Sequence, residues 1–233
     1  MIGAGEIAIS DERSGVPTAH ELARIAHDVY TSGILCKKAG VIHLHVGGGT
    51  SRLELLRELI DKHNVKPGRL YPTHISRSRE LLAEAVDLAK RGSFVDIDTV
   101  DEDLPKQLAL YFELEGPGEK LTVSSDSSTT GPMNLLEQFR SCVLRGGIAL
   151  EKVLALITSN TAGVLKLPRQ GNIRFGNAAG VLVMSKRDLD LKEVICRGRR
   201  LFKEGSLAVK EAFLKDSNRK IVLEGKRDVK HVP

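Results

Sequence analysis

The chain has 233 residues, of which 41% are hydrophobic and 28% are charged, a composition typical of one globular domain with at most a small second one. No apolar run approaches the roughly 18 residues that a membrane span needs, so we expect a soluble protein. The net charge is +5, but the chain has no Trp and only 4% aromatic residues, which favours a solvated basic surface over nucleic-acid binding.

Short apolar runs alternate with amphipathic stretches from residue 1 to residue 130. Such alternation predicts βαβ units and a parallel sheet. The five expected strands are Gly3–Ser10, Gly40–Val46, Leu70–Ile75, Phe94–Thr99 and Leu121–Ser125.

The stretches between these strands carry helix signals. Thr18 with Glu21, and Ser51 with Glu54, fit the capping box at a helix start. Residues 79–91 place a broad apolar face before Gly92 and predict a helix. The later segments are expected to be a loop at Glu113–Lys120 and helices at Met133–Leu144 and Leu150–Thr158, the last extended by Thr161–Leu165.

After residue 168 the pattern changes to short strands and tight turns. Val181–Met184 and Val194–Cys196 are predicted to be strands, and Arg197–Leu207 a hairpin that turns at Glu204-Gly205. We therefore expect a main α/β domain over residues 1–167 and a small β-rich unit over 168–213. A charged tail, expected to be flexible, occupies residues 214–233.

Polar residues gather where the expected strands end, which is where catalytic groups lie in parallel α/β folds. The residues concerned are Glu6, Ser10-Asp11, His43-Leu44-His45, Thr73-His74 and Ser124-Ser125-Asp126. Imidazole and carboxylate are the ligands of a catalytic zinc ion, which keeps one position open for water. Each residue also has an ordinary alternative, such as a core histidine, a buried ion pair or a turn cap, but four units together favour a metal site.

Three neighbouring features support less specific interpretations. His43 shares a strand face with His45, and a hydrogen-bonded interior histidine is favoured over a second ligand. Gly47–Gly49 lacks the spacing of a phosphate-binding loop, which favours a tight turn near the metal. Arg13 and Arg77 follow the proposed ligands and suit a substrate with carboxylates, or equally form surface salt bridges.

These residues resemble the isoaspartyl dipeptidases, β-aspartyl metallopeptidases of the amidohydrolase superfamily. The motifs that carry the resemblance are Ile2–Ser14, His45–Gly47, Leu70–Arg77, Ser124–Asp126, Gly171–Asn177 and Val194–Gly198. The resemblance covers most of the chain to residue 213. It implies a partial TIM-like (β/α) barrel that matches strands four to eight of the family, followed by the C-terminal part of a small β-sandwich.

The resemblance also implies a role for each matched residue. Glu6 takes the place of the ligand that bridges two metals, and His45 and His74 hold the second metal. Asp126 binds the first metal and moves the proton. The implied reaction is zinc-dependent hydrolysis of β-aspartyl dipeptides by metal-activated water.

Three further residues match positions that contact the substrate in the family. Arg13 and Arg77 correspond to the substrate-binding arginines, and Thr130 to a hydroxyl-bearing residue.

The chain departs from the family in two places. The His-x-His pair that holds the first metal lies upstream of the bridging ligand, and here Glu6 is the sixth residue. Ala178-Ala179-Gly180 stands where the superfamily usually has an acidic residue. We therefore interpret the chain as truncated at its N-terminus, with one or two zinc ions and low activity.

Two alternatives to this function stay open on the sequence. One is a cyclic amidohydrolase like dihydroorotase or hydantoinase, and the other is an inactive truncated scaffold. The isolated cysteines, Cys36, Cys142 and Cys196, predict a reducing cytoplasm and no disulfide framework. The expected partners are a small dipeptide substrate and further copies of the chain, with neither nucleic acid nor membrane.

Overall fold

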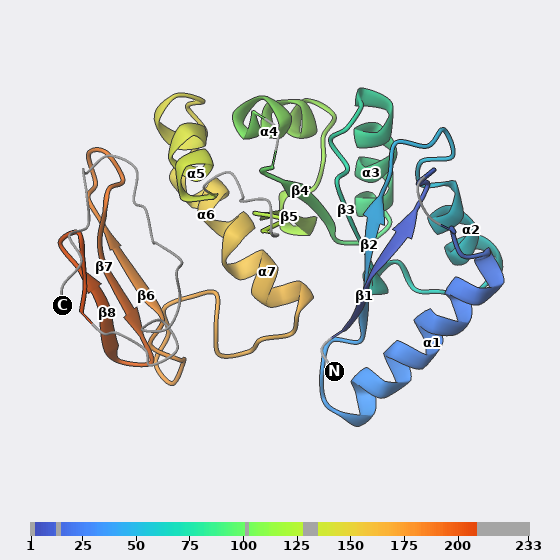
Figure 1. The fold of residues 1–233 in the computed structure, drawn as a ribbon, viewed down its shortest axis with the longest axis horizontal. Helices are drawn as coiled ribbons and strands as arrows, with labels where there is room; N and C mark the ends of the chain where they lie inside the picture. Colours follow the sequence, from blue (N-terminus) through green and yellow to red (C-terminus); the bar gives the residue numbers. More distant parts are fainter. Residues whose placement is uncertain (1–2, 13–14, 101–102, 128–134, 209–233) are drawn as a thin grey trace. The chain divides into compact units, whose positions relative to one another are not determined.

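The computed structural model describes residues 3–12, 15–100, 103–127 and 135–208 (Figure 1). The chain forms two compact units, residues 1–171 and residues 172–233. Among the described residues, no helix is both long and apolar enough to cross a membrane.

All five strands expected in the first unit are present, each within two residues of its expected bounds. They are β1 (Gly3–Ile9), β2 (Val41–Val46), β3 (Leu70–Thr73), β4 (Val95–Asp98) and β5 (Leu121–Ser124). The first three form a parallel sheet in chain order, and β4 and β5 form a separate parallel pair. The prediction of a mixed α/β fold with parallel strands is therefore confirmed.

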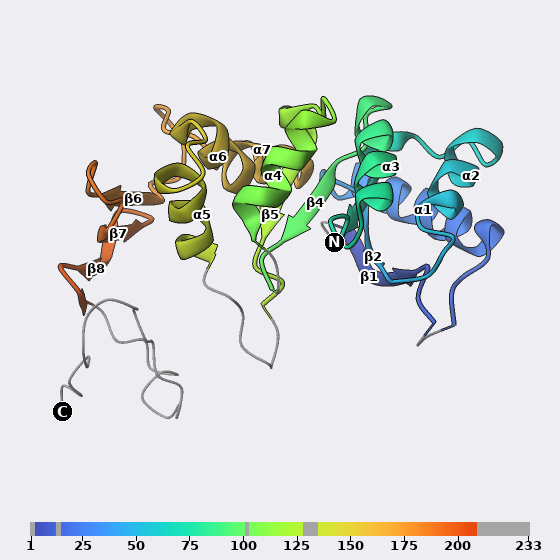
Figure 2. The same ribbon diagram turned by 90° about the horizontal axis from the view of Figure 1, so that it is seen from above.

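Helices follow the strands as the alternation predicts. They are α1 (Ala19–Leu35), α2 (Glu54–Lys62), α3 (Arg79–Lys90), α4 (Leu104–Glu113), α5 (Leu135–Leu144), α6 (Leu150–Ile157) and α7 (Ser159–Val164), with short 3-10 turns η1 (Pro67–Arg69) and η2 (Gly118–Lys120). Figure 2 shows α1, α2 and α3 on one side of β1 and β2. The sheet therefore has one face covered by helices, as βαβ connections require.

The side chains of β2 show how the strand serves both the core and the site. Ile42 and Leu44 are fully buried. His43 and His45 alternate with them and point to the opposite face, because successive side chains of a strand alternate. Packing on one face of the strand thus fixes where the two imidazoles are presented on the other.

One of the two predicted capping boxes is confirmed. The Glu21 N–H donates to Thr18 Oγ1 at 3.3 Å, and the Thr18 N–H donates to Glu21 Oε2 at 2.9 Å. These two bonds satisfy backbone donors that a helix start leaves free.

The second predicted capping box, Ser51 with Glu54, is wrong. Helix α2 has Leu53 at its N-cap and no side-chain cap bond from that residue. The Leu53 N–H instead donates to Glu84 Oε2 at 3.3 Å, and the Ser51 hydroxyl donates to Ser10 Oγ at 3.1 Å. Tertiary partners replace the local cap, which no pattern within the helix itself could show.

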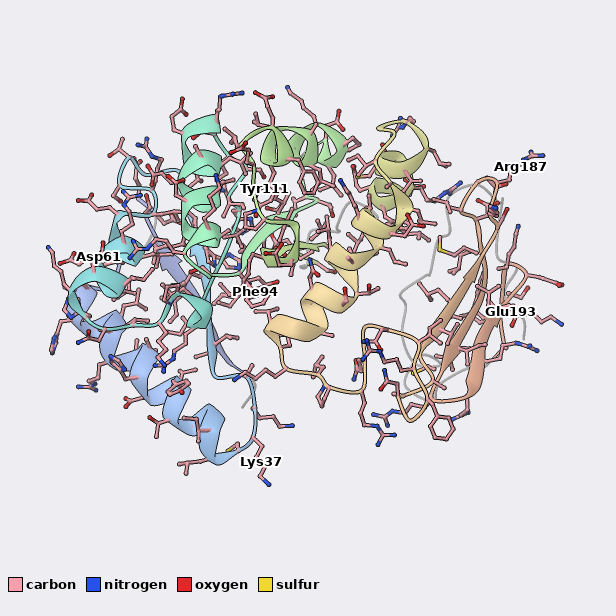
Figure 3. All side chains as sticks on the ribbon, turned by 180° about the vertical axis from the view of Figure 1, so that it is seen from behind. Lys37, Asp61, Phe94, Tyr111, Arg187 and Glu193 are labelled. Atoms are coloured by element: carbon pink, nitrogen blue, oxygen red, sulfur yellow. The ribbon has the colours of Figure 1, made fainter. Side chains whose placement is uncertain are left out.

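Two connections are more ordered than expected. The segment predicted as a loop contains η2, and the Tyr111 hydroxyl at the end of α4 donates to Pro117 O at 3.1 Å (Figure 3). Thr158, with φ of −128° and ψ of −84°, separates α6 from α7, so α7 is a helix of its own.

The second unit is a four-stranded antiparallel sheet. Its strands β6 (Val181–Met184), β7 (Leu191–Cys196), β8 (Arg199–Lys203) and β9 (Ser206–Leu207) pair in chain order. The predicted turn at Glu204-Gly205 is confirmed, and both residues have positive φ, 49° and 86°. Positive φ at both central residues is what the two-residue type I′ hairpin needs.

Candidate metal centre

Ligand atoms from four strands of the first unit, or from residues just beyond them, approach one another. Glu6, His43 and His45 form one group, and His45, His74 and Asp126 form another, each with its ligand atoms within 4.8 Å. His45 belongs to both groups. The structure thus brings together all four residues that the sequence proposed as metal ligands.

The carboxyl ends of the parallel strands position three of these residues. His45 is the next-to-last residue of β2, His74 directly follows β3, and Asp126 lies two residues beyond β5. His74 and Asp126 have φ of 62° and 44°, in the left-handed region that non-glycine residues seldom adopt. Such backbone strain persists only where surrounding contacts hold it, and it concentrates at functional sites.

Glu6 does not lie at a strand end as expected, because β1 continues to Ile9. The pairing of β1 with β2 is irregular between Ala4 and Ile7, and Glu6 lies inside this bulge. A bulge re-aims a side chain. The Glu6 side chain is 63% exposed, and its Oε1 lies 3.3 Å from His45 Nε2.

His74 is the most firmly held of the proposed ligands. Its Nδ1 lies 2.6 Å from Asp98 Oδ2, and both side chains are less than a tenth exposed. Burial opposes the charge on Asp98 and is the largest single influence, but the hydrogen bonds from His74 and from the Val100 N–H, together with the attraction of His74, hold the pKa of Asp98 below its ordinary value. Asp98 is therefore an ionised acceptor at neutral pH, and we assign the proton to His74 Nδ1.

This assignment leaves His74 Nε2 with its lone pair directed into the site. Nε2 lies 3.1 Å from His45 Nδ1 and 3.9 Å from Asp126 Oδ2. A carboxylate on the far nitrogen is the usual way in which proteins orient a metal-binding histidine. The pair His74–Asp98 therefore has the arrangement of an oriented ligand.

The buried Nε2 atom of His45 provides a test of whether the residues of this site fit a metal ion. His45 Nε2 is buried and makes no hydrogen bond with the described residues, although Glu6 Oε1 lies 3.3 Å away. Buried polar atoms rarely lack a partner. Each group offers two imidazoles and one carboxylate, a donor set that zinc accepts, so the residues fit a metal.

His43 lies beside this group rather than in its centre. Its ring centroid is 5.4 Å from that of His45 and 5.1 Å from that of Tyr71. Burial lowers the pKa of His43, which favours the neutral imidazole. The geometry is compatible with both interpretations of His43, an interior histidine and an additional ligand.

No family model matches the sequence, whereas solved structures do. The beta-aspartyl dipeptidase of Fervidobacterium islandicum AW-1 is 32% identical, with a TM-score of 0.84 over 91% of this chain. Its complex with the β-Asp-Leu dipeptide is 31% identical, with a TM-score of 0.81. The chain is a relative of the beta-aspartyl dipeptidases. It spans 59% of the length of that enzyme.

More distant structures share the fold alone. A triazine hydrolase variant matches with a TM-score of 0.55 at 14% identity, over 90% of this chain and 52% of its own. N-acetylglucosamine-6-phosphate deacetylase from Pasteurella multocida matches with a TM-score of 0.57 at 14% identity, over 76% and 53%. The resemblance to beta-aspartyl dipeptidases expected from the sequence is thus confirmed by the first two structures, and the wider likeness extends only to the fold.

The structure describes fewer of the residues expected to bind substrate than of the proposed metal ligands. Arg77 is exposed in the segment between β3 and α3, three residues after His74. Arg13 and Thr130 lie outside the described residues. Gly47 packs closely against the segment that follows β1, since a Cβ there would lie 2.5 Å from Ser10 O.

Two carboxylates near the site, Asp96 and Asp98, were not identified from the sequence. Both lie on β4, a strand that supplies none of the proposed ligands. The sequence does carry a signal, because Val95-Asp96-Ile97-Asp98 alternates acidic and apolar residues in a strand that is otherwise expected to be buried. Buried carboxylates are rare unless they are paired, so this alternation indicates partners nearby.

Proposed function

We propose that this chain is part of a metal-dependent hydrolase that cleaves β-aspartyl dipeptides, with Glu6, His45, His74 and Asp126 as its metal ligands. One observation carries the proposal: imidazole and carboxylate groups converge in a chain 32% identical to a beta-aspartyl dipeptidase. The bound β-Asp-Leu of that relative indicates the substrate class to test.

Zinc is the proposed metal, because it accepts both nitrogen and carboxylate ligands. A zinc ion bound there would lower the pKa of a water ligand towards about 7 and polarise the scissile carbonyl. Asp126, whose side chain is 32% exposed, can accept a proton at its carboxylate and pass it to the leaving amine. His74 keeps its Nε2 directed into the site because Asp98 holds its other nitrogen.

Substrate carboxylates would be bound by arginine, which pairs with them through two parallel hydrogen bonds. Arg77 is exposed just beyond the ligand that follows β3, so it can reach a dipeptide at the site. We assign the same role to Arg13, and a substrate contact to Thr130. Both assignments rest on the resemblance to the family.

We further propose that β1 to β5 are part of a (β/α) barrel and that residues 168–213 are part of a small β-sandwich. The parallel strands with their following helices support the barrel, and the antiparallel sheet of the second unit supports the sandwich. Assembly of several chains is proposed as well, since β1 pairs only with β2 among the described strands. Such a free strand edge invites association.

The test is hydrolysis of β-Asp-Leu by the 233-residue chain with and without zinc. We expect slow, zinc-dependent hydrolysis that is lost in His74→Ala and in Asp126→Asn. His20→Ala is the matched control, because His20 is a histidine of the same unit on α1 and outside both ligand groups. Its activity should equal that of the unsubstituted chain.

Two other results would contradict the proposal, and a third would contradict only the expected rate. Preferential hydrolysis of a hydantoin or of dihydroorotate would indicate a cyclic amidohydrolase. Absence of zinc binding, together with unchanged stability of His74→Ala, would indicate a scaffold without catalysis. Full turnover at the rate of a complete beta-aspartyl dipeptidase would refute the expectation that this chain is slow.

A further inference from the structure

Strand β4 carries two carboxylates on one face although it supplies none of the proposed ligands. Asp96 and Asp98 are two residues apart and therefore point to the same side of the strand. Asp98 contacts the His74 ring directly. Asp96 lies one layer deeper and is fully buried. None of its described hydrogen bonds involves the side chain of a proposed metal ligand.

Asp96 accepts hydrogen bonds from hydroxyl groups of the two flanking strands. On β3 the donors are Tyr71 and Thr73, and on β5 they are Thr122 and Ser124. A buried carboxylate is costly unless its oxygens are hydrogen-bonded. Burial raises the pKa of Asp96, and the hydroxyl donors act in the opposite direction.

The two oxygens of Asp96 serve different partners. Oδ2 accepts from Thr73 at 2.8 Å and from Ser124 at 2.6 Å. Oδ1 accepts from Thr122 at 2.5 Å and from Tyr71 at 3.3 Å. The partners of Oδ2 are the pair that lies nearer the carboxyl ends of their strands.

The partners of Oδ2 also adjoin two of the proposed ligands in the chain. Thr73 is bonded to His74, and Ser124 precedes Asp126 by two residues. Both ligands have strained left-handed backbones, so their positions depend on what holds the preceding residues. For Thr73, backbone pairing does not supply that restraint, since β3 and β4 belong to different sheets among the described strands. Ser124 is also paired through its backbone with Asp98 on β4, so the bond to Asp96 adds to that pairing.

We propose that Asp96 is a positioning residue, which through its Oδ2 oxygen fixes Thr73 and Ser124 and thereby sets His74 and Asp126 at the distance a metal ion needs. The inference rests on the proposed function, because it assigns a role towards the same metal. Asp96 touches neither metal nor substrate in this role. Its Oδ1 bonds with Tyr71 and Thr122 stabilise the same carboxylate without reaching a ligand.

The division of the oxygens provides a matched set of variants. Thr73→Val and Ser124→Ala each remove one hydroxyl from Oδ2, whereas Thr122→Val removes one from Oδ1. All three lose a hydrogen bond to the same buried carboxylate, and Thr122→Val also loses the hydrogen bond between Thr122 Oγ1 and the Tyr71 hydroxyl at 2.6 Å. Its loss of stability should therefore be at least as large as theirs. Thr73→Ser keeps the hydroxyl and serves as the rescue variant.

The measurement is the zinc dissociation constant by competition with a chromogenic chelator, with the urea midpoint of each variant recorded alongside. We expect Thr73→Val and Ser124→Ala to bind zinc at least about tenfold more weakly, the scale found when groups that orient ligands are removed. Thr122→Val and Thr73→Ser should stay within about threefold of the unsubstituted chain, below that scale.

Two results would overturn the inference alone. One is an equal loss of zinc affinity in Thr122→Val and Thr73→Val, which would make Asp96 a purely structural crosslink. The other is unchanged affinity in Thr73→Val and Ser124→Ala. If the unsubstituted chain binds no zinc, the proposed function fails first and this inference fails with it, so the two failures are distinguishable.

Discussion

The hydrogen bond between Asp98 and His74 leads to a quantitative prediction for Asp98→Asn. The substitution keeps the size of the side chain and removes its charge. Asparagine has a single acceptor oxygen, so with that oxygen facing His74 it keeps a neutral hydrogen bond there and gives up the bond that Asp98 Oδ1 accepts from the Val100 N–H at 3.1 Å. The bond to His74 Nδ1 thus changes from a charged to a neutral one, and we expect weaker zinc binding.

The magnitude follows from the burial of the pair. Both side chains are less than a tenth exposed, so water does not screen their interaction appreciably. Hydrogen bonds to charged groups contribute about 1.5–3 kcal/mol net and neutral ones about 1 kcal/mol. The difference of about 1–2 kcal/mol corresponds to roughly a five- to thirtyfold increase in the zinc dissociation constant.

Chelator competition at neutral pH measures this change directly. Asp61→Asn is the matched control, because Asp61 pairs with Arg91 on the surface and is 55% exposed. It should leave the dissociation constant unchanged. A zinc dissociation constant of Asp98→Asn within about twofold of that of the unsubstituted chain would refute the reasoning, because the expected change is larger. An equal increase of the dissociation constant in Asp61→Asn would refute it as well.

Three predictions concern stability. Burial alone would raise the pKa of Glu84, but bonds from Arg57 and Arg52 keep it below its ordinary value. Glu84→Gln should therefore lower the free energy of unfolding in urea by about 1 kcal/mol at neutral pH, a modest loss because both arginines are partly exposed. The difference from the unsubstituted chain should disappear as the pH falls through the folded-state pKa of Glu84, and a difference that persisted would contradict this. Ser78→Ala removes the cap of α3 and should cost about 1 kcal/mol by thermal unfolding, with Ser78→Thr retaining stability. Leu44→Ala should cost about 2–5 kcal/mol in urea, and Leu44→Met much less.

Strands and helices of the first unit were predictable because their signals are local. Alternation of apolar runs with amphipathic stretches located all five strands, and Gly92 marked the end of α3. The failed capping box at Ser51 shows the limit of such signals. Its hydroxyl bonds to Ser10, and the start of α2 is held by Glu84, which lies 31 residues beyond Leu53. Partners at that separation leave no mark in the helix sequence.

The candidate site was predictable to the extent that strand ends define it. His45, His74 and Asp126 lie at the carboxyl ends of their strands, where the position in the chain fixes the position in space. Glu6 was proposed for its residue type, but the irregular pairing that aims its side chain depends on β2. Asp96 and Asp98 were missed because their partners lie on neighbouring strands, and the alternating pattern of β4 does not say which ones.

The orientation of His45 decides which group of ligands a single metal ion can use. Its Nδ1 faces His74 Nε2 at 3.1 Å, whereas its Nε2 faces Glu6 Oε1 at 3.3 Å. One ring nitrogen binds one metal, so a single ion takes either Nδ1 with His74 and Asp126 or Nε2 with Glu6. His74 is buried and held by Asp98, while Glu6 is 63% exposed on an irregular edge of the sheet. Ordering an exposed carboxylate costs conformational entropy that the buried histidine does not incur, so we expect the group with His74 and Asp126 to bind the first ion.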